Sequence, residues 1–318
     1  MKILITGIHG FVGSNLVNAL KDQHEIYGLD IIAPEKEGVI KTFSWEDLDD
    51  DRIPSVDAII HLAGKAHDTK NKSGADIYFK VNTDLTKRIF DYFTNRLEIK
   101  KFIFFSSVKA AVDKVPGEIL TEDVTPSPVG PYGESKVKAE EHIMGKLETT
   151  PDVYKGRDVI ILRPCMIHGP GNKGNLNLLY GFVRKGLPWP LGAFENNRTF
   201  TSIGNLTFII SELLRKKVES GIYNMADDHA LSTNELIQVM CKAMEKKARI
   251  WKINKGLINF GARTGDLLHL PLNTFRLEKL TENYVVSNAK IKKALGIDKM
   301  PVDATDGLTL TIRSFSGN

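Results

Sequence analysis

Residues 3–13 read Ile-Leu-Ile-Thr-Gly-Ile-His-Gly-Phe-Val-Gly, and this stretch decides how the chain folds. A short apolar run leads into three glycines, Gly7, Gly10 and Gly13, and apolar residues at helical spacing follow as far as Gln23. Such glycines allow a tight turn, a close backbone approach to a pyrophosphate and close packing of the helix on the strand. Backbone N–H groups at the helix start would face the diphosphate. The stretch predicts a dinucleotide site, although the same turn could form without a ligand.

The alternation of strand-like and helix-like segments continues through the first half of the chain. Near-continuous apolar runs indicate buried strands, and apolar residues three or four apart indicate helices. The expected strands are 25–30, 57–63, 101–107 and 159–164, and the expected helices are 77–96 and 131–146. Apolar strands separated by helices predict an α/β fold, a Rossmann-like doubly wound parallel sheet with helices on both faces.

The second half of the chain is less regular. Residues 169–204 are rich in Gly, Pro and Asn, which predicts loops around one helix at 177–185. A helix at 205–217, a strand at 221–225 and a helix at 232–246 are expected after them. We expect two interleaved domains. Residues 1–165 plus about 199–228 would bind the dinucleotide, and about 166–198 plus 229–318 would form a smaller C-terminal substrate domain.

The composition is that of an ordinary globular protein. The 318 residues are 42% hydrophobic and 26% charged, which excludes a disordered tail, a fibre and a disulfide mini-scaffold. The net charge of +4 is too small an excess to indicate a nucleic-acid partner. We interpret the basic run Lys242–Lys255 as a solvated surface.

Cysteine usage and hydropathy bear on localisation. Two cysteines in a long chain, Cys165 and Cys241, are typical of a reduced protein. No apolar run approaches the roughly 18 residues of a membrane span, and the N-terminus lacks the pattern of a signal peptide. We therefore expect a cytoplasmic protein without a membrane partner.

Asp30 ends the second expected strand, 17 residues after Gly13. A carboxylate there can accept hydrogen bonds from the hydroxyls of the adenosine ribose. It would repel a 2′-phosphate, and no arginine follows directly, so the sequence favours NAD over NADP. An acidic residue that merely ends a strand is the alternative interpretation.

Tyr132 and Lys136 lie four residues apart on one expected helix and so share a face. The lysine charge is expected to favour the phenolate and to lower the tyrosine pKa from about 10, which would make a general acid/base. Ser106 and Ser107 end an expected strand, at the sheet edge where open parallel sheets bind ligands. A serine hydroxyl there could hydrogen-bond an oxygen that alternates between alcohol and ketone.

These motifs together resemble the extended short-chain dehydrogenase/reductase family, in particular its nucleotide-sugar epimerase/dehydratase branch. The matching stretches are Thr-Gly-x-x-Gly-Phe-Val-Gly at 6–13, His-Leu-Ala-Gly at 61–64, Ser-Ser at 106–107, Tyr-x-x-x-Lys at 132–136 and Leu-Arg-Pro at 162–164. The resemblance covers residues 1 to about 228.

The resemblance implies three groups of site residues. The catalytic group is Ser107, Tyr132 and Lys136, with Ser106 as the less favoured hydroxyl. The cofactor group, for NAD, is Gly7, Gly10, Phe11, Val12, Gly13, Asp30, Leu62, Ala63, Gly64, Asn82, Ser106, Tyr132, Lys136 and Pro164. The substrate group is Ser107, Asn175, Leu176 and Arg198, the last as a diphosphate ligand.

Two positions depart from the family pattern. Met166 and His168 stand where the family often has asparagine and tyrosine, which leaves the placement of the sugar open. The histidines His9, His61, His67 and His168 match no zinc spacing, so we expect no metal site.

The resemblance and the catalytic residues together imply a UDP-hexose or UDP-N-acetylhexosamine 4-epimerase that oxidises C4 transiently, with a place in polysaccharide biosynthesis. The alternative is a 4-ketoreductase acting on a UDP-4-keto-6-deoxy sugar. A 4,6-dehydratase is disfavoured, because Val108 and Lys109 stand where that chemistry uses a carboxylate pair. A non-catalytic NAD-binding sensor is a third hypothesis. The family also implies a homodimer through helices 77–96 and 131–146.

Overall fold

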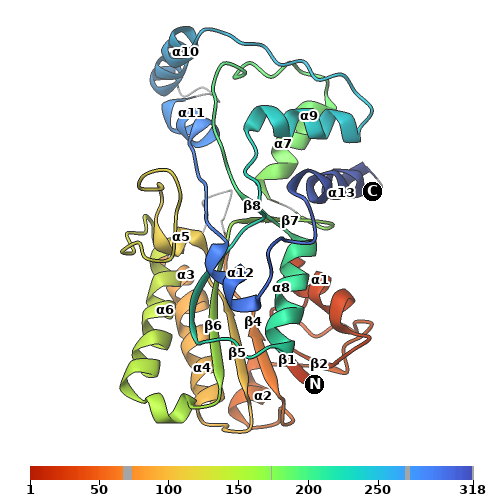
Figure 1. Ribbon diagram of the computed structural model, residues 1–318, viewed down its shortest axis with the longest axis vertical. Coiled ribbons are helices and arrows are strands. Elements are labelled where there is room, and N and C mark those ends of the chain that lie inside the picture. Colours follow the sequence, from red (N-terminus) through yellow and green to blue (C-terminus); the bar gives the residue numbers. More distant parts are fainter. Residues whose placement is uncertain (67–73, 173, 269–272, 317–318) are drawn as a thin grey trace.

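The computed structural model describes residues 1–66, 74–172, 174–268 and 273–316. Its centre is a seven-stranded sheet in the order β3-β2-β1-β4-β5-β6-β9, and all neighbouring strands pair in parallel (Figure 1). The strands are β1 (Lys2–Thr6), β2 (Glu25–Leu29), β3 (Lys41–Phe43), β4 (Ala58–His61), β5 (Lys101–Phe105), β6 (Asp158–Pro164) and β9 (Gly221–Met225). The order reverses between β1 and β4, which confirms the doubly wound fold and places its ligand-binding switch point there.

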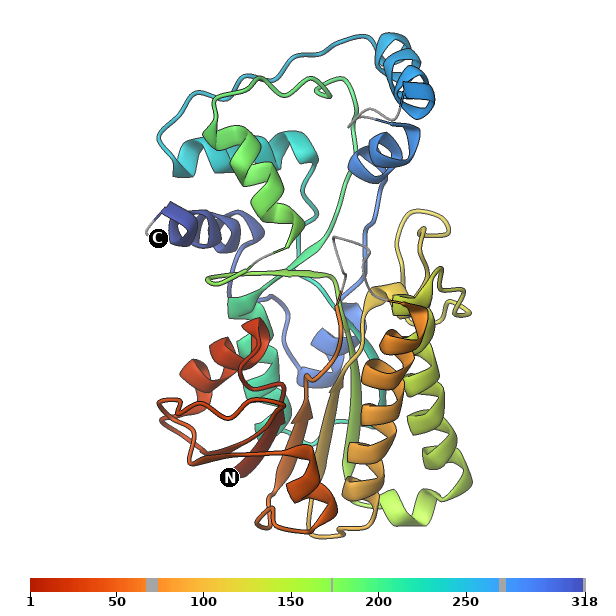
Figure 2. The same ribbon diagram turned by 180° about the vertical axis from the view of Figure 1, so that it is seen from behind.

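Side chains of the strands alternate between two hydrophobic clusters, one on each face of the sheet. On β1, Ile3 and Ile5 join one cluster and Leu4 joins the other. The first cluster is covered by helices α1 (Phe11–Leu20), α8 (Ile203–Arg215) and α12 (Ala289–Leu295). The second is covered by α2 (Trp45–Asp49), α4 (Leu85–Thr94) and α6 (Pro131–Thr149). Figure 2 shows α4 and α6 side by side along the sheet.

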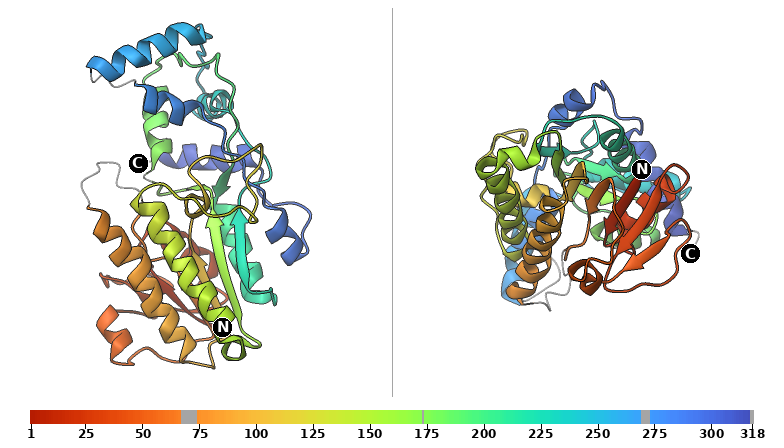
Figure 3. Two further views of the ribbon diagram at one scale, coloured as in Figure 1. Left: turned by 90° about the vertical axis from the view of Figure 1, so that its left-hand side faces the viewer. Right: turned by 90° about the horizontal axis from the view of Figure 1, so that it is seen from below.

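A second lobe lies beyond the carboxyl ends of the strands (Figure 1). A parallel pair of short strands, β7 (Met166–His168) and β8 (Phe200–Ser202), leads into it. Its helices are α7 (Asn175–Arg184), α9 (Thr233–Ala243), α10 (Lys255–Leu268), α11 (Thr274–Thr281) and α13 (Ala304–Ser316), and they share a third hydrophobic cluster. The lobe extends the molecule along its long axis (Figure 3).

Most expected elements lie within a few residues of their predicted bounds, and the strand expected at 221–225 has the same bounds as β9. The helix expected at 77–96 begins earlier, as α3 (Ala75–Tyr78), and contains a π-helical segment, η1 (Phe79–Asp84), before α4. The sequence analysis does not predict several elements. They include α5 (Val108–Ala111), the 3-10 turn η2 (Pro151–Tyr154) and the four described helices after residue 246, α10 to α13.

The division into two interleaved domains stays a prediction. The second half of the chain does return to the first lobe, since α8 and β9 pack there. Helix α12 packs on β9 as well, and its Ile291 and Leu295 belong to the first cluster. Within the described residues, no helix combines the length and apolar character that crossing a membrane requires.

The glycine turn allows a stability test, because a Cβ at Gly13 would lie 2.5 Å from the Gly7 carbonyl oxygen and 2.7 Å from that of Ile8. Both atoms are backbone, so they cannot move aside. We expect Gly13→Ala to lower the free energy of unfolding in chemical denaturation by about 1–3 kcal/mol. Gly145→Ala is the matched control, since no described atom lies within 4 Å of its Cβ, and alanine should stabilise α6 by up to about 1 kcal/mol. Equal effects at the two positions would contradict the geometry.

Candidate active site

The predicted dinucleotide turn connects β1 to α1. Gly7 adopts φ of +68°, donates its N–H to the Leu29 carbonyl at 2.9 Å, and lies so close to Ala63 that a Cβ would meet its backbone at 2.9 Å. Gly10 is the N-cap of α1, and among the described residues no side chain caps this helix and no acidic residue occupies its first turn. The first N–H groups of a ten-residue helix thus lie at the switch point without a competing carboxylate, which fits a diphosphate.

Asp30 directly follows β2, beside the same turn. One carboxylate oxygen accepts the N–H of His9 at 3.1 Å and the other accepts the N–H of Ile31 at 2.7 Å. These bonds fix the carboxylate next to the glycine turn. Its predicted role toward the adenosine ribose is compatible with this position, because each oxygen can accept a further hydrogen bond.

His61 belongs to a buried chain of hydrogen bonds rather than to a metal site. Thr6 Oγ1 accepts the N–H groups of Leu62 and Ala63, at 3.2 and 3.0 Å, and lies 2.6 Å from His61 Nδ1. His61 Nε2 lies 2.9 Å from Thr86 Oγ1, whose hydroxyl donates to the Asn82 carbonyl at 2.7 Å. Because the Thr86 hydroxyl already donates its hydrogen to Asn82, it can only accept from His61. His61 Nε2 therefore carries the hydrogen and donates to Thr86, and His61 Nδ1 accepts from the Thr6 hydroxyl. Burial holds the His61 pKa well below its ordinary value, which agrees with a neutral ring.

Asn82 ties the segment after β4 to the helix that carries the tyrosine. Its Oδ1 accepts the N–H of Lys65 at 2.7 Å, and its amide donates to the Lys65 carbonyl at 3.1 Å and to Ser135 Oγ at 3.0 Å. Ser135 Oγ in turn donates to the Tyr132 carbonyl at 2.9 Å. A Cβ on Gly64 would come within 3.1 Å of both Asn82 Oδ1 and Lys136 Nζ. The predicted cofactor residues 62–64 and 82 therefore lie beside the first turns of α6.

Tyr132 lies in the first turn of α6, partly buried, and forms a side-chain hydrogen bond with Ser107. Its ring meets that of Tyr78 edge-on, at 6.4 Å between centroids. The expectation of a lowered tyrosine pKa is wrong for the protein without its ligands: burial raises the Tyr132 pKa, and the bond to Ser107 offsets this only in part. The reason is that burial removes water from the phenolate.

Lys136 follows one helical turn later and is buried. Its Nζ donates to the Phe105 carbonyl at 2.8 Å and lies 4.9 Å from the centre of the Phe104 ring. Burial lowers the Lys136 pKa to about 8, although the nearby Glu140 charge favours the protonated form. A lysine anchored to the end of β5 in this way sits one helical turn from Tyr132, on the same face of α6.

The two serines at the end of β5 have different partners. The Ser106 hydroxyl donates to Glu140, which also forms a buried two-pronged ion pair with Arg163 at 3.0 and 2.5 Å. Ser107 instead caps α5, where its Oγ accepts the N–H of Lys109 at 3.2 Å, and bonds Tyr132. The geometry therefore favours Ser107 as the hydroxyl that works with Tyr132. The sequence predicts no role for Glu140 and Arg163. The spacing of Glu140, four residues after Lys136, places it on the same face of α6, but nothing in the sequence indicates that Arg163 on β6 is its partner.

The predicted substrate residues lie farther away, in or near the second lobe. Leu176 is 3% exposed in the third hydrophobic cluster, and Asn175 is the first residue of α7. Arg198 bonds the Lys279 and Glu282 carbonyls and pairs with the Glu282 carboxylate at 3.1 Å. Its role as a diphosphate ligand stays a prediction and would require the guanidinium to exchange Glu282 for phosphate oxygens.

The remaining predicted positions lie around the end of β6. Pro164 is buried as the last residue of β6, in register with Met225 of β9. Met166 is 38% exposed, whereas His168 is buried with Nδ1 2.9 Å from Thr311 Oγ1. His67 lies outside the described residues.

A doubly wound sheet, a glycine turn beside an acidic residue, and a Ser-Tyr-Lys group at the ends of adjacent strands define an enzyme of the extended short-chain dehydrogenase/reductase class. A family model described as the NAD dependent epimerase/dehydratase family matches residues 3–226. The chain belongs to this family, and NAD is its cofactor.

Three known proteins illustrate the similarity. The chain is 31% identical over 262 residues to a UDP-glucose 4-epimerase of Vibrio cholerae, covering 77% of this chain and 76% of that one. It is 27% identical over 299 residues to the N-acetyl-alpha-D-glucosaminyl-diphospho-ditrans,octacis-undecaprenol 4-epimerase of Escherichia coli O157:H7, covering 92% and 85%. The fold matches UDP-glucuronic acid 4-epimerase from Bacillus cereus in complex with NAD, with a TM-score of 0.74 at 19% identity over 100% and 99% of the chains.

The buried Lys136 ammonium generates a prediction about stability. Below pH 8 the folded state bears the full cost of the buried charge. Between about pH 8 and 10.4, Lys136 is neutral in the folded protein but still protonated in the unfolded chain. The destabilisation that the buried ammonium causes therefore disappears as the pH rises through this range. Lys136→Met removes the cost of the buried charge but also loses the hydrogen bond to the Phe105 carbonyl. We expect the net result to be a free energy of unfolding that is higher by about 2 kcal/mol at pH 7. Chemical denaturation from pH 7 to 10 should show this gain shrinking above pH 8.

The control is Lys138→Met, an exposed lysine two residues farther along α6. Its effect should be small and should not follow the same pH window. A Lys136→Met protein that is less stable than the parent at pH 7 would contradict a costly buried charge.

Proposed function

We propose that the protein is a nucleotide-sugar 4-epimerase, with a UDP-hexose or UDP-N-acetylhexosamine as substrate. The observation that carries the proposal is the hydrogen bond between Ser107 and Tyr132, with Lys136 one helical turn away at the end of β5. This arrangement offers a proton acceptor and a hydrogen-bond donor to a single alcohol oxygen. The 31% identity to a UDP-glucose 4-epimerase supports the same choice.

The residues have separate tasks in this reaction. NAD, when bound, supplies the acceptor and donor of the C4 hydride. Tyr132 takes the proton of the C4 hydroxyl and later returns it, while Ser107 hydrogen-bonds the C4 oxygen in its alcohol and ketone forms. Because burial raises the Tyr132 pKa, the phenolate needs a nearby positive charge, and we assign this task to protonated Lys136, one helical turn farther along α6. The sugar then turns so that its other face receives the hydride.

The carrier of the sugar is a separate question. Arg198, if it leaves Glu282, would bind a diphosphate whether that group bears a nucleoside or a lipid. The relative from Escherichia coli is named for an undecaprenyl-linked diphosphate sugar, and it aligns with 92% of this chain. An assay of the proposed activity should therefore include a polyprenyl-diphosphate sugar beside the UDP-hexoses.

The 4-ketoreductase remains the second candidate, because the same Ser-Tyr-Lys group can protonate a reduced ketone. The two differ in what happens to the cofactor: an epimerase recycles it, whereas a reductase consumes it. We expect the denatured protein to release NAD in a near-stoichiometric amount. Absence of nucleotide together with turnover that depends on added NADPH would favour the reductase.

Tyr132→Phe tests the catalytic assignment. We expect it to lower turnover at least about a hundredfold, since the proton acceptor is lost, while NAD still leaves the denatured protein in the same amount. Tyr92→Phe is the matched control, because Tyr92 also precedes a basic residue, Arg96, by four positions but lies on α4. Full turnover by Tyr132→Phe would overturn the assignment, whereas absence of turnover in the parent together with retained NAD would favour the non-catalytic NAD-binding sensor.

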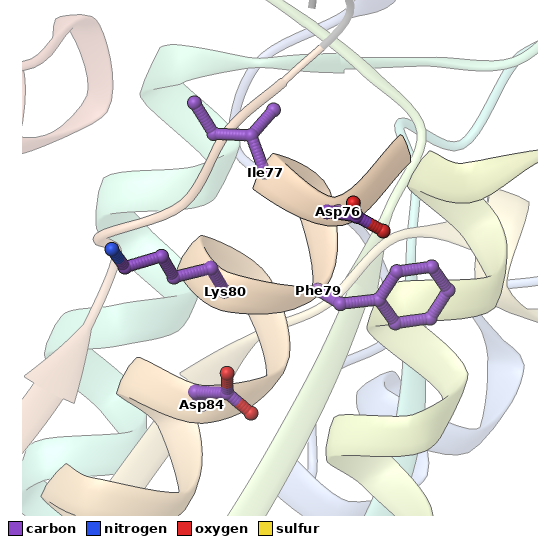
Figure 4. A pocket seen from close by; sticks show the side chains of 5 residues that line it. All are labelled: Asp76, Ile77, Phe79, Lys80 and Asp84. Carbon is purple, nitrogen blue, oxygen red and sulfur yellow. The ribbon is translucent and has the colours of Figure 1, made fainter. Parts of the chain in front are cut away.

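We also propose that the chain forms a homodimer through α6 and the helix that runs from α3 to α4. A hollow of about 580 Å³ on this surface is lined by Asp76, Ile77, Phe79, Lys80 and Asp84. Ile77 and Lys80 point to one side of the helix and Phe79 points to the other, toward α6 (Figure 4). Ile77 is 42% exposed, which a partner could cover.

Sedimentation tests the dimer. At micromolar concentration we expect a dimer, and Ile77→Glu should shift it toward monomer because a charge would then be buried in the interface. A parent protein that sediments only as a monomer would remove the proposal.

We further propose a cytoplasmic location. Cys165 and Cys241 are both buried free thiols, which is typical of proteins kept in a reducing compartment.

A further inference from the structure

Helix α10 carries an apolar face that no described residue covers. Leu257, Phe260, Leu267 and Leu268 are 66%, 71%, 79% and 60% exposed. Their spacing places them on one side of the helix, and we call them the α10 outer face. Within the described part of the chain, nothing buries these four side chains, and an exposed apolar patch of this kind marks an interaction surface.

A different side of the same helix holds it to the protein. Ile258, Ala262 and Gly265 are buried, and the first two belong to the third hydrophobic cluster. Among the described residues, the outer face therefore takes no part in packing α10 on the lobe. Two apolar side chains close to α10 in the sequence are also exposed, Phe275 on α11 at 66% and Trp251, four residues before α10, at 56%.

The surrounding sequence is strongly basic. Residues 246–280 contain eight Lys and Arg and only two Asp and Glu, an excess of six positive charges. The whole chain has a net charge of +4, so the remaining residues are slightly acidic. Five of the eight basic residues lie at 246–255, in the segment that leads into α10 and includes its first residue. An apolar helix face flanked by lysine and arginine is the pattern of helices that lie in the interface of an anionic membrane.

The position of α10 suits such a role. In both opposite views it lies with α11 at the end of the molecule farthest from the sheet, so a broad surface could approach it without obstruction (Figures 1 and 2). Lys279 on α11 pairs with Asp113, two residues after α5, and Glu282, directly after α11, pairs with Arg198. The surface is thus connected to the proposed diphosphate ligand through a single short helix.

We propose that the α10 outer face, with Phe275 and Trp251, docks on a lipid surface that bears anionic headgroups. A second copy of the chain is the less suitable occupant, because two such surfaces would bring six excess positive charges against six. The proposal assigns a function to the basic run Lys242–Lys255, which the sequence alone predicts to be a solvated surface. It also revises the expectation of no membrane partner, because a helix can bind a membrane surface without spanning it.

Vesicle flotation tests the proposal without any sugar substrate, so its failure is distinct from failure of the epimerase proposal. We expect the full-length protein to float with vesicles of phosphatidylcholine and phosphatidylglycerol, and less with phosphatidylcholine alone or at high salt. Phe260→Ser combined with Leu267→Ser should reduce the bound fraction at least about tenfold. Its turnover of a UDP-hexose in solution should match that of the parent.

The matched control is Leu97→Ser combined with Leu310→Ser. Leu97 lies in the turn after α4 and is 62% exposed, and Leu310 lies on α13 and is 60% exposed. This variant should bind vesicles like the parent, and thermal unfolding should show that both variants are folded. The proposal is overturned if the parent does not float, or if loss of the outer face leaves flotation unchanged. It is also overturned if the outer-face variant changes only the oligomeric state, since the face would then bind a second copy.

Discussion

A buried ion pair between Glu140 and Arg163 fixes the helix that carries the catalytic group. The two side chains are 2% and 1% exposed, and the Ser106 hydroxyl completes the partners of the carboxylate. Such a pair is stable only when both charges are present and well bonded, because a single buried charge costs several kcal/mol, roughly 3–5. Tyr132, Lys136 and Glu140 follow at intervals of four residues, so anchoring Glu140 at the sheet orients all three along the ends of β5 and β6.

A second connection reaches the same helix from the dinucleotide turn. Thr6, at the end of β1, donates a hydrogen bond from its hydroxyl to His61, His61 donates to Thr86, and Thr86 donates to the Asn82 carbonyl. The Asn82 amide then bonds Ser135 in the first turns of α6. Every donor in this series of hydrogen bonds has an acceptor. A buried polar network makes a structure rigid when its members are satisfied in this way. The glycine turn and the catalytic group are thereby parts of one rigid unit.

The features that could be predicted from the sequence are those that depend on local spacing. The three glycines, Asp30 and the Tyr132–Lys136 pair each follow from residues within one strand-turn-helix unit or one helix. The partners of Arg163 and Arg198 could not be predicted, because they come from other elements, and burial reversed the expected direction of the Tyr132 pKa. Helix α10 was missed because it contains Gly256, Gly261 and Gly265 and is apolar on two sides, which obscures a single helical period.

The central claim is that Tyr132 and its neighbours serve a reversible oxidation at C4 of a sugar diphosphate. The most direct measurement uses the UDP-hexose that the enzyme interconverts most rapidly, labelled with deuterium at C4 and analysed by mass spectrometry after turnover. The account predicts that the product keeps the deuterium at C4 and that no added cofactor is consumed, since the hydride returns to the carbon it left. Three results would contradict it: loss of the label to solvent, net consumption of a reduced cofactor, or no interconversion of any UDP-hexose, UDP-N-acetylhexosamine or polyprenyl-diphosphate sugar.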